Sequence, residues 1–516
     1  MVIVRSVKIK VKIKDLVINS QEEVIIKITK EVLSLFHIEF FPNHLKSTNM
    51  EYDYLSLKII NTEISAAIVP TIFTSVVLVD MNGNEQAYER QSSGHSTEKL
   101  LAALRRLIKM NLYNILLTVF GGPPAPWGIM HGVRPTKIVH KYIKQGLSPS
   151  IIKERLQEDY AVLPDKATML VEIAYKQLPF LALGDERTVS IYIGIPFCLS
   201  RCLYCSFPAY IVPDTAALQE FYQALMRDLQ AAKQMVDKHQ LKVQNIYIGG
   251  GTPTSLPTEM FSKLLEVVYK AFYQPHTKEF TVEAGRPDSV NDRKIDAMRR
   301  YSVDRVSVNP QTMQEKSLKR IGRNHSVSDI IELFGKFRQT TNFKINMDII
   351  VGLPGETVVE IDDTIAQVLA LQPNDITLHA LALKKGSILK MQPERYHLPD
   401  DTMSAKMFAS ALSKIYSAGY QPYYLYRQGY MRGNMENIGC SKVGSECLYN
   451  IQIMEENQTI IGIGPAATTK VVNANLLGME TSFNAKDLTT YLNSVDKYSE
   501  KRKVLLDRAF SKQGGI

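Results

Sequence analysis

Cysteine and tryptophan are both scarce in this chain. Its 516 residues include five cysteines and one tryptophan. Five is an odd number and a small one for this length, which argues against the disulfide frameworks that hold secreted domains together. Reduced thiols are the ordinary state of cysteine in the cytoplasm. We therefore expect a cytoplasmic protein with free thiols.

Long apolar runs are absent as well. The longest, residues 64–79, contains Pro70 and several hydroxyl side chains and is too short to cross a bilayer as a helix. The first ten residues mix apolar side chains with arginine and lysine, unlike the continuous apolar segment of a signal peptide. The sequence predicts no membrane span and no export.

The net charge of +9 comes from basic residues that are spread along the chain and form no tail. A solvated surface explains such a charge, and so does attraction to an anionic partner. No basic tract or motif predicts binding to nucleic acid. With 45% apolar and 22% charged residues, the composition is that of a globular protein with a sizeable core.

Three of the five cysteines stand together in a C-x3-C-x2-C run, as Cys198, Cys202 and Cys205. Three thiolates on one loop can hold three irons of a cubane [4Fe-4S] cluster, whereas ordinary four-iron sites use four cysteines. The fourth iron is then open to a small molecule. A zinc knuckle is the alternative, but it needs a second pair, and Cys440 and Cys447 lie far downstream with a different spacing.

Strand-like and helix-like segments alternate between residues 186 and 385. Six short apolar runs are each followed by a helical pattern, at residues 189–195, 245–248, 280–282, 305–308, 344–350 and 375–378. Such alternation predicts an α/β fold with a parallel sheet and crossover helices. Active sites in these folds lie at the carboxyl ends of the strands, and the cysteines follow the first run.

We expect further regions on both sides of this core. Residues 1–165 read as a separate N-terminal α/β domain, with strands expected at 7–14, 55–60, 76–80 and 86–90, helices at 21–35 and 97–117, and a hairpin turn at Asn82 and Gly83. The loop around Trp127 could contact a substrate or a partner, but we expect a packed connection. Residues 386–516 read as a C-terminal α+β extension with a helix at 402–419.

Several polar or glycine residues follow the other strands. The loop Gly249–Gly250–Gly251 lets a ligand approach the backbone closely, although it is neither a Walker loop nor a dinucleotide fingerprint. Glu283, Gln311, Arg323 and Asp348 lie at or after strand ends. Carboxylates accept hydrogen bonds from ribose hydroxyls and arginine binds carboxylates, so these residues suit a nucleoside with an amino-acid group. Each one alone could instead cap a helix.

Taken in order, these motifs resemble the oxygen-independent coproporphyrinogen III oxidase family of radical S-adenosylmethionine (SAM) proteins, and its HemZ-like branch in particular. The resemblance covers residues 189–469. It implies a partial (βα)6 TIM-like barrel at 186–385 and a substrate-covering region at 386–516. It also implies that Cys198, Cys202 and Cys205 hold a [4Fe-4S] cluster, and that SAM is bound by Tyr192, Gly250, Gly251, Glu283, Gln311, Arg323, Asp348 and Ala380. Residues 463–468 resemble a loop that closes over the adenosine.

The resemblance also implies a reaction. One electron from a donor such as flavodoxin or ferredoxin cleaves SAM, and the resulting radical takes a β-hydrogen from a propionate of coproporphyrinogen III. Loss of carbon dioxide and one electron then converts that propionate into a vinyl group on the tetrapyrrole. An anaerobic setting follows from the oxygen sensitivity of an open cluster.

Two features depart from the pattern of these oxidases. Phe207 stands where they have a further cysteine, and residues 1–165 lie outside the general family. Cys-x-Phe is found in related haem chaperones, so a haem-binding role and an enzyme that acts on another tetrapyrrole stay open. The segment 423–432, rich in tyrosine and arginine, and the pair Lys384–Lys385 suit a tetrapyrrole with carboxylates, or else form an ordinary surface.

Overall fold

A computed structural model describes residues 9–10, 22–36, 40–41, 54–60, 71–79, 84–95, 98–121, 125–132, 134–207, 209–384, 386–392, 395–428, 435–472 and 478–511. The chain divides into two compact units, Met1–Val171 and Glu172–Ile516. The predicted three-part division into 1–165, 186–385 and 386–516 stays a prediction. No helix among the described residues has the length and apolar character needed to cross a membrane.

The first unit is a small α/β assembly. Its antiparallel sheet has the order β3-β4-β5 (Tyr54–Ile60, Thr71–Val79 and Glu85–Ser93), and β1 (Ile9–Lys10) pairs with β2 (Phe40–Phe41). Helices α1 (Glu22–Ser34) and α2 (Leu100–Phe120) cover the sheet, and Val32, Ile72, Val76 and Leu116 are buried between them. Helices α3 (Thr136–Lys144), α4 (Pro149–Tyr160) and α5 (Pro164–Leu181) follow, the last crossing the boundary between the units.

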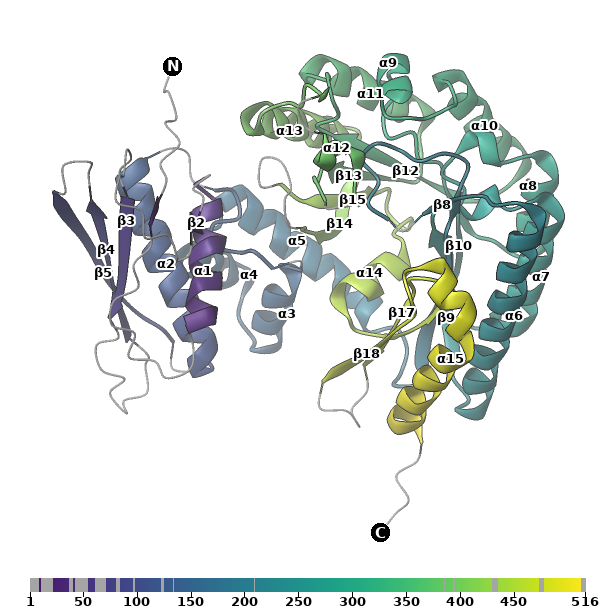
Figure 1. The fold of residues 1–516 in the computed structure, drawn as a ribbon, viewed down its shortest axis with the longest axis horizontal. Coiled ribbons are helices and arrows are strands. Elements are labelled where there is room, and N and C mark those ends of the chain that lie inside the picture. Colours follow the sequence, from purple (N-terminus) through teal and green to yellow (C-terminus); the bar gives the residue numbers. More distant parts are fainter. Residues whose placement is uncertain are drawn as a thin grey trace, which may run out of the picture. The chain divides into compact units, whose positions relative to one another are not determined.

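The second unit is built on six parallel strands in chain order, as the sequence predicts. They are β6 (Thr188–Ile195), β9 (Lys242–Gly250), β10 (Glu279–Glu283), β11 (Arg305–Ser307), β12 (Lys344–Val351) and β13 (Asp375–Ala380). Helices lie along the outer side of this curved sheet (Figure 1). They are α6 (Thr215–Lys238), α7 (Thr258–Phe272), α8 (Asp292–Arg300), α9 (Glu315–Arg320), α10 (Val327–Thr340) and α11 (Val358–Leu371).

The strands form because their residues are apolar and largely β-branched, and both faces are covered. In β6, Val189, Ile191, Ile193 and Ile195 are fully buried, as expected of a parallel strand that helices and the barrel interior enclose. The helices begin at capping residues. Ser326 and Asp329 form a capping box at α10, and Thr357 and Glu360 form one at α11.

The C-terminal region extends the barrel sheet at both edges. Strand β15 (Asn437–Ser441) pairs antiparallel with β13, and β14 (Gln421–Tyr426) pairs antiparallel with β15. At the other edge, β16 (Thr459–Ile463) pairs parallel with β6. Strands β17 (Thr468–Val472) and β18 (Met479–Phe483) complete an eleven-stranded sheet. The remaining helices are α12 (Ile388–Met391), α13 (Asp401–Ser417), α14 (Leu448–Glu455) and α15 (Leu488–Phe510). Arg502 of α15 pairs with the buried Asp228 of α6, across 2.6 Å.

The other predicted elements are found with small shifts at their ends. Helices expected at 21–35, 97–117 and 402–419 correspond to α1, α2 and α13, and β4 begins earlier than the strand expected at 76–80. Trp127 is fully buried, which confirms the packed connection. The turn at Asn82 and Gly83 lies outside the described residues, as does most of the strand expected at 7–14.

Candidate active site

A cavity of about 330 Å³ opens at the carboxyl ends of the parallel strands. All eleven residues that the sequence singles out line it: Tyr192, Cys198, Cys202, Cys205, Gly250, Gly251, Glu283, Gln311, Arg323, Asp348 and Ala380. Parallel strands place their carboxyl ends at one rim, which explains how residues so distant in sequence come to share one cavity.

The three cysteines lie on a loop that is held by its backbone. It begins at β7 (Phe197–Cys198), which pairs with β8 (Tyr210–Ile211). The amide of Leu203 donates to the carbonyl of Ile321 at 3.0 Å. The hydroxyl of Ser200 donates to the carbonyl of Gly322 at 3.0 Å, and Arg286 donates to that hydroxyl at 2.8 Å. These contacts position the loop independently of any ligand.

The arrangement of the thiols is compatible with a cluster. Among the described residues, no three cysteine, histidine, aspartate or glutamate side chains converge on one point as the ligands of one metal ion do. A cubane takes one thiolate per iron, so its ligands need not converge. Cys202 is buried, and burial raises the pKa of the Cys198 and Cys205 thiols. A bound metal favours the thiolate form.

The triple-glycine loop packs directly against the start of the cysteine loop. The amide of Gly251 donates to the carbonyl of Ile195 at 2.7 Å. A Cβ atom on Gly251 would lie 2.5 Å from the carbonyl oxygen of Phe197, and Gly250 has a φ of +113°. The glycines are therefore needed for the approach of the two loops, and both also face the cavity.

Glu283 lies at the end of β10 and is fixed by two donors. The hydroxyl of Tyr247 donates to it at 2.7 Å, and the amide of Gly250 donates at 3.2 Å. Burial raises the pKa of Glu283 to about 7, and the nearby Asp348 adds to the effect, while both hydrogen bonds act against it. Because this pKa lies near neutral pH, the protonation state of Glu283 is sensitive to the charge of a ligand bound beside it.

A stack of tyrosines supports Glu283 from inside the barrel. The rings of Tyr192, Tyr247 and Tyr449 contact one another pairwise. The centroid of Tyr247 lies 6.1 Å from that of Tyr192 and 4.4 Å from that of Tyr449, and the centroids of Tyr192 and Tyr449 lie 6.2 Å apart. Tyr449 belongs to α14, whose first amides, those of Leu448 and Tyr449, donate to the carboxylate of Glu279 at 3.3 and 3.2 Å. Glu279 therefore fixes the helix that carries Tyr449.

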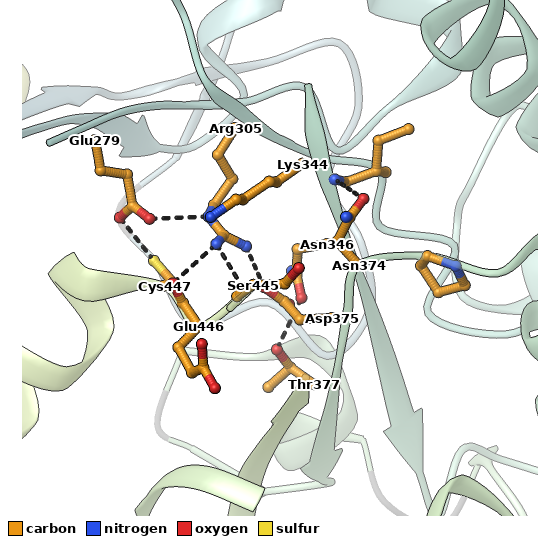
Figure 2. A network of polar contacts seen from close by, with 12 residues as sticks. Glu279, Arg305, Lys344, Asn346, Asn374, Asp375, Thr377, Ser445, Glu446 and Cys447 are labelled. Atoms are coloured by element: carbon orange, nitrogen blue, oxygen red, sulfur yellow. Dashed lines mark hydrogen bonds and ion pairs between the residues drawn. The ribbon is translucent and has the colours of Figure 1, made fainter. Parts of the chain in front are cut away.

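Glu279 is part of a buried polar network at the amino ends of the strands, which Figure 2 shows. The guanidinium of Arg305 contacts Glu279 at 3.1 Å, pairs with Asp375, and donates to the carbonyls of Ser445 and Glu446. The thiol of Cys447 donates to Glu279 at 3.2 Å. Cys440 and Cys447 are both buried free thiols outside the cavity.

Asp348 is held in a second polar chain. Asn346 donates to its carboxylate at 2.7 Å. Thr377 in turn donates to Asn346 at 3.2 Å, a contact that Figure 2 shows. The Nε2 atom of His379 lies 3.7 Å from the same carboxylate. Burial acts to raise the pKa of Asp348, but His379 and these hydrogen bonds outweigh it and lower the pKa. Asp348 therefore stays ionised beside the cavity.

The remaining predicted residues are fixed by backbone contacts. Gln311 has a φ of +68° and bridges to β12, exchanging hydrogen bonds of 2.9 Å with Asp348 and Ile350. Arg323 donates to the carbonyl of Gly285 and the hydroxyl of Tyr204, each at 3.1 Å, but its buried Nε has no partner among the described residues. The amide of Ala380 donates to Oδ1 of Asn437 at 3.1 Å; Asn437 is not among the residues predicted from the sequence.

Two segments named in the sequence lie differently with respect to the cavity. Residues 463–468 are not among its lining residues, and their role in closing over the adenosine stays a prediction; Gly464 packs on β6, where the carbonyl of Gly194 leaves no room for a side chain. In the segment 423–432, Tyr423 and Tyr424 are buried in the core and offer no face to a ligand. The strand instead points Tyr426 into the cavity. Tyr430, Arg432 and Lys385 lie outside the described residues.

Other cavity residues are not singled out in the sequence. His379 and Asn437 line the wall formed by the last strands, beside Tyr426 of the segment 423–432, and Tyr204, Arg286 and Asn309 line the wall near the cysteines. His379 could have been predicted as a cavity residue because it directly precedes Ala380 at a strand end. Asn437 and Tyr247 could not have been predicted as functional residues, because neither stands in a motif.

Comparison with known proteins agrees with this geometry. Residues 192–368 match the model of the radical SAM superfamily. The chain is 38% identical over 408 residues to the oxygen-independent coproporphyrinogen-III oxidase-like protein HemZ of Bacillus subtilis, covering 78% of this chain and 81% of that protein. It is 29% identical over 282 residues to the haem chaperone HemW of the same organism, covering 54% of this chain and 70% of the relative.

A solved structure has the same fold. The radical SAM enzyme coproporphyrinogen III oxidase (HemN) of Escherichia coli superposes with a TM-score of 0.50 at 20% identity, over 65% of this chain and 78% of that one. The cofactors of the radical SAM superfamily are a [4Fe-4S] cluster and SAM. The cavity fits both, because it offers three thiols on one loop, a glycine cradle and a buried Arg323 Nε that lacks an acceptor.

Proposed function

This chain belongs to the oxygen-independent coproporphyrinogen-III oxidase-like family of radical SAM proteins, and we propose that it oxidatively decarboxylates coproporphyrinogen III. In that reaction a propionate side chain loses a β-hydrogen atom, carbon dioxide and one electron and becomes a vinyl group. Two such rounds give protoporphyrinogen IX. The observation that carries the proposal is the joint presence of the three thiols and the polar SAM-type residues in one cavity.

The cysteines would hold the cluster. When bound, the cluster and SAM together supply one-electron reduction and hydrogen-atom abstraction. Cys198, Cys202 and Cys205 would each bind one iron, and the hydroxyl of Thr252, 3.4 Å from the sulfur of Cys198, would hydrogen-bond that thiolate. Hydrogen bonds to cluster sulfurs tune the reduction potential.

The polar residues would bind and orient SAM. Arg323 Nε is a buried donor and would take an acceptor of the methionyl group. Glu283 and Asp348 would accept hydrogen bonds from the amino group or the ribose hydroxyls. The contribution of this chain to catalysis is positional, since its side chains hold the reacting groups close together and exclude water.

The proposal is tested by an anaerobic assay. The full chain is reconstituted with iron and sulfide and supplied with SAM, a strong reductant and coproporphyrinogen III. We expect 5′-deoxyadenosine and a vinyl-bearing tetrapyrrole to rise together, and both to be lost in Cys202→Ala. SAM cleavage with an unchanged porphyrinogen would refute the oxidase activity and leave the radical SAM assignment intact.

A second candidate is a haem-binding role such as that of a haem chaperone. Two observations favour it: the 29% identity to HemW, and Phe207, which is 59% exposed and borders the cavity two residues after the last cysteine. An exposed aromatic ring can pack on a flat macrocycle. Stoichiometric binding of haem without SAM-dependent turnover would support this role over the enzyme.

A further inference from the structure

Three side chains from neighbouring strands form a polar row on one wall of the cavity. In the sheet register, Asn437 of β15 lies opposite His379 of β13 on one side and Tyr426 of β14 on the other. Residues paired across strands point to the same face of a sheet, and all three line the cavity. Two of the three, Tyr426 and Asn437, belong to strands beyond the six-stranded core.

The orientation of the Asn437 amide is fixed by the backbone. Its Oδ1 accepts a hydrogen bond from the amide of Ala380 at 3.1 Å. A backbone N–H can only donate, so the other atom must be the NH2 group. The side chain is 2% exposed, and Nδ2 has no acceptor among the described residues. A buried donor without an acceptor is unfavourable, and here it borders a cavity large enough for a ligand.

A lysine borders the same cavity as this donor. Lys384 lines it, and within the described part of the chain no carboxylate forms an ion pair with its ammonium group. Burial lowers the pKa of Lys384, against the influence of Cys205. Asp348, the carboxylate on this side, is already engaged by Asn346 and His379. Beside the ionised Asp348, the cavity therefore offers the Nδ2 donor of Asn437, which lacks an acceptor among the described residues, and the ammonium group of Lys384.

From these contacts we infer that the row His379–Asn437–Tyr426, together with Lys384, is a subsite for a carboxylate of the substrate. Nδ2 of Asn437 donates to one carboxylate oxygen, and Lys384 supplies the positive charge. Hydrogen bonds to an ionised acceptor are stronger than neutral ones. The inference rests on the proposed tetrapyrrole function, whose substrate carries propionates. The carboxylate of SAM has the same chemistry, but Arg323, on the wall near the cysteines, provides a separate donor for it.

The test compares two isosteric side chains. Asn437→Asp keeps an oxygen for the Ala380 amide but replaces the NH2 donor with a second, negatively charged oxygen. Coproporphyrin III, the stable oxidised form with four propionates, is titrated by fluorescence into the cluster-loaded full chain, and SAM is titrated separately by calorimetry. We expect the Kd for coproporphyrin III to rise at least about tenfold, with the Kd for SAM unchanged.

The other outcomes of these titrations would overturn either the carboxylate subsite or the proposed tetrapyrrole function. A weaker Kd for SAM with unchanged porphyrin binding overturns the inference and assigns Asn437 to the cofactor, and no change in either Kd also overturns it. Wild-type protein that binds SAM but no porphyrin refutes the proposed tetrapyrrole function itself, so the two failures are distinguishable. Asn437→Ala, which also removes the donor, is measured in parallel with thermal melting in case the aspartate variant does not fold.

Discussion

The hydroxyl of Tyr247 lies 2.7 Å from the carboxylate of Glu283 and donates a hydrogen bond to it at the mouth of the barrel. The two residues lie on neighbouring parallel strands, Tyr247 within β9 and Glu283 at the end of β10, and the same carboxylate accepts from the amide of Gly250 in the glycine loop. Through this contact the tyrosine stack inside the barrel sets the position and charge of a residue at the site.

SAM binding should depend on pH through Glu283. Burial raises the pKa of this carboxyl to about 7, so it becomes protonated as the pH falls through 7 and is then a weaker acceptor. We expect the Kd for SAM to be about tenfold higher at pH 6 than at pH 8, measured by calorimetry on the cluster-loaded protein. Glu283→Gln should bind weakly at every pH; a retained pH dependence in this variant would assign the titration to another group.

Tyr247→Phe should move that transition to higher pH. The hydrogen bond from Tyr247 lowers the pKa of Glu283, so its loss raises the pKa, by about one unit for one hydrogen bond to a charged group. The midpoint of SAM affinity against pH reports the change. Tyr269→Phe, on the outer helix α7, is the matched control and should leave the midpoint in place.

A change in the glycine loop should disturb cluster binding by the cysteine loop. Gly251→Ala would place a Cβ 2.5 Å from the carbonyl of Phe197, and the resulting shift reaches the cysteine loop. We expect iron content after reconstitution and SAM affinity both to fall at least about tenfold. Gly335→Ala, in α10 with open space around the new Cβ, should retain both. Normal iron content in Gly251→Ala would show that the loop adapts.

Of the five cysteines, only Cys198, Cys202 and Cys205 should be needed to bind the iron–sulfur cluster. Cys202→Ala is expected to lose the iron, the sulfide and the charge-transfer absorption of the reconstituted protein, because an iron loses its thiolate. Cys440→Ala is a matched change at a buried thiol outside the cavity and should keep all three. Full cluster content in Cys202→Ala would contradict the assigned ligand set.

The network around Arg305 should contribute to stability. Glu279→Gln removes one charge of a buried pair and weakens the contacts that hold α14. Breaking a buried ion pair costs about 3–5 kcal/mol, and we expect a loss of this order in urea denaturation. Glu500→Gln, in an exposed pair with Lys503, should change stability by less than about 1 kcal/mol.

Much of the site is determined by the sequence alone. The spacing of Cys198, Cys202 and Cys205 depends on local chain geometry, and the six alternating strands and helices follow from apolar periodicity. Because parallel strands end at one rim, the order of strands was enough to predict that Glu283, Gln311 and Asp348 meet. These are consequences of local pattern and a regular topology.

Other features were decided only by the tertiary structure. Asn437 reaches the cavity because β15 reverses direction and pairs with β13, and no local pattern encodes that register. The Tyr192–Tyr247–Tyr449 stack joins three elements that are distant in sequence. Burial sets the charge of Glu283, and burial is a property of the packed molecule. The sequence determined which chemical groups are present, whereas the fold decided which of them face one another and with what charge.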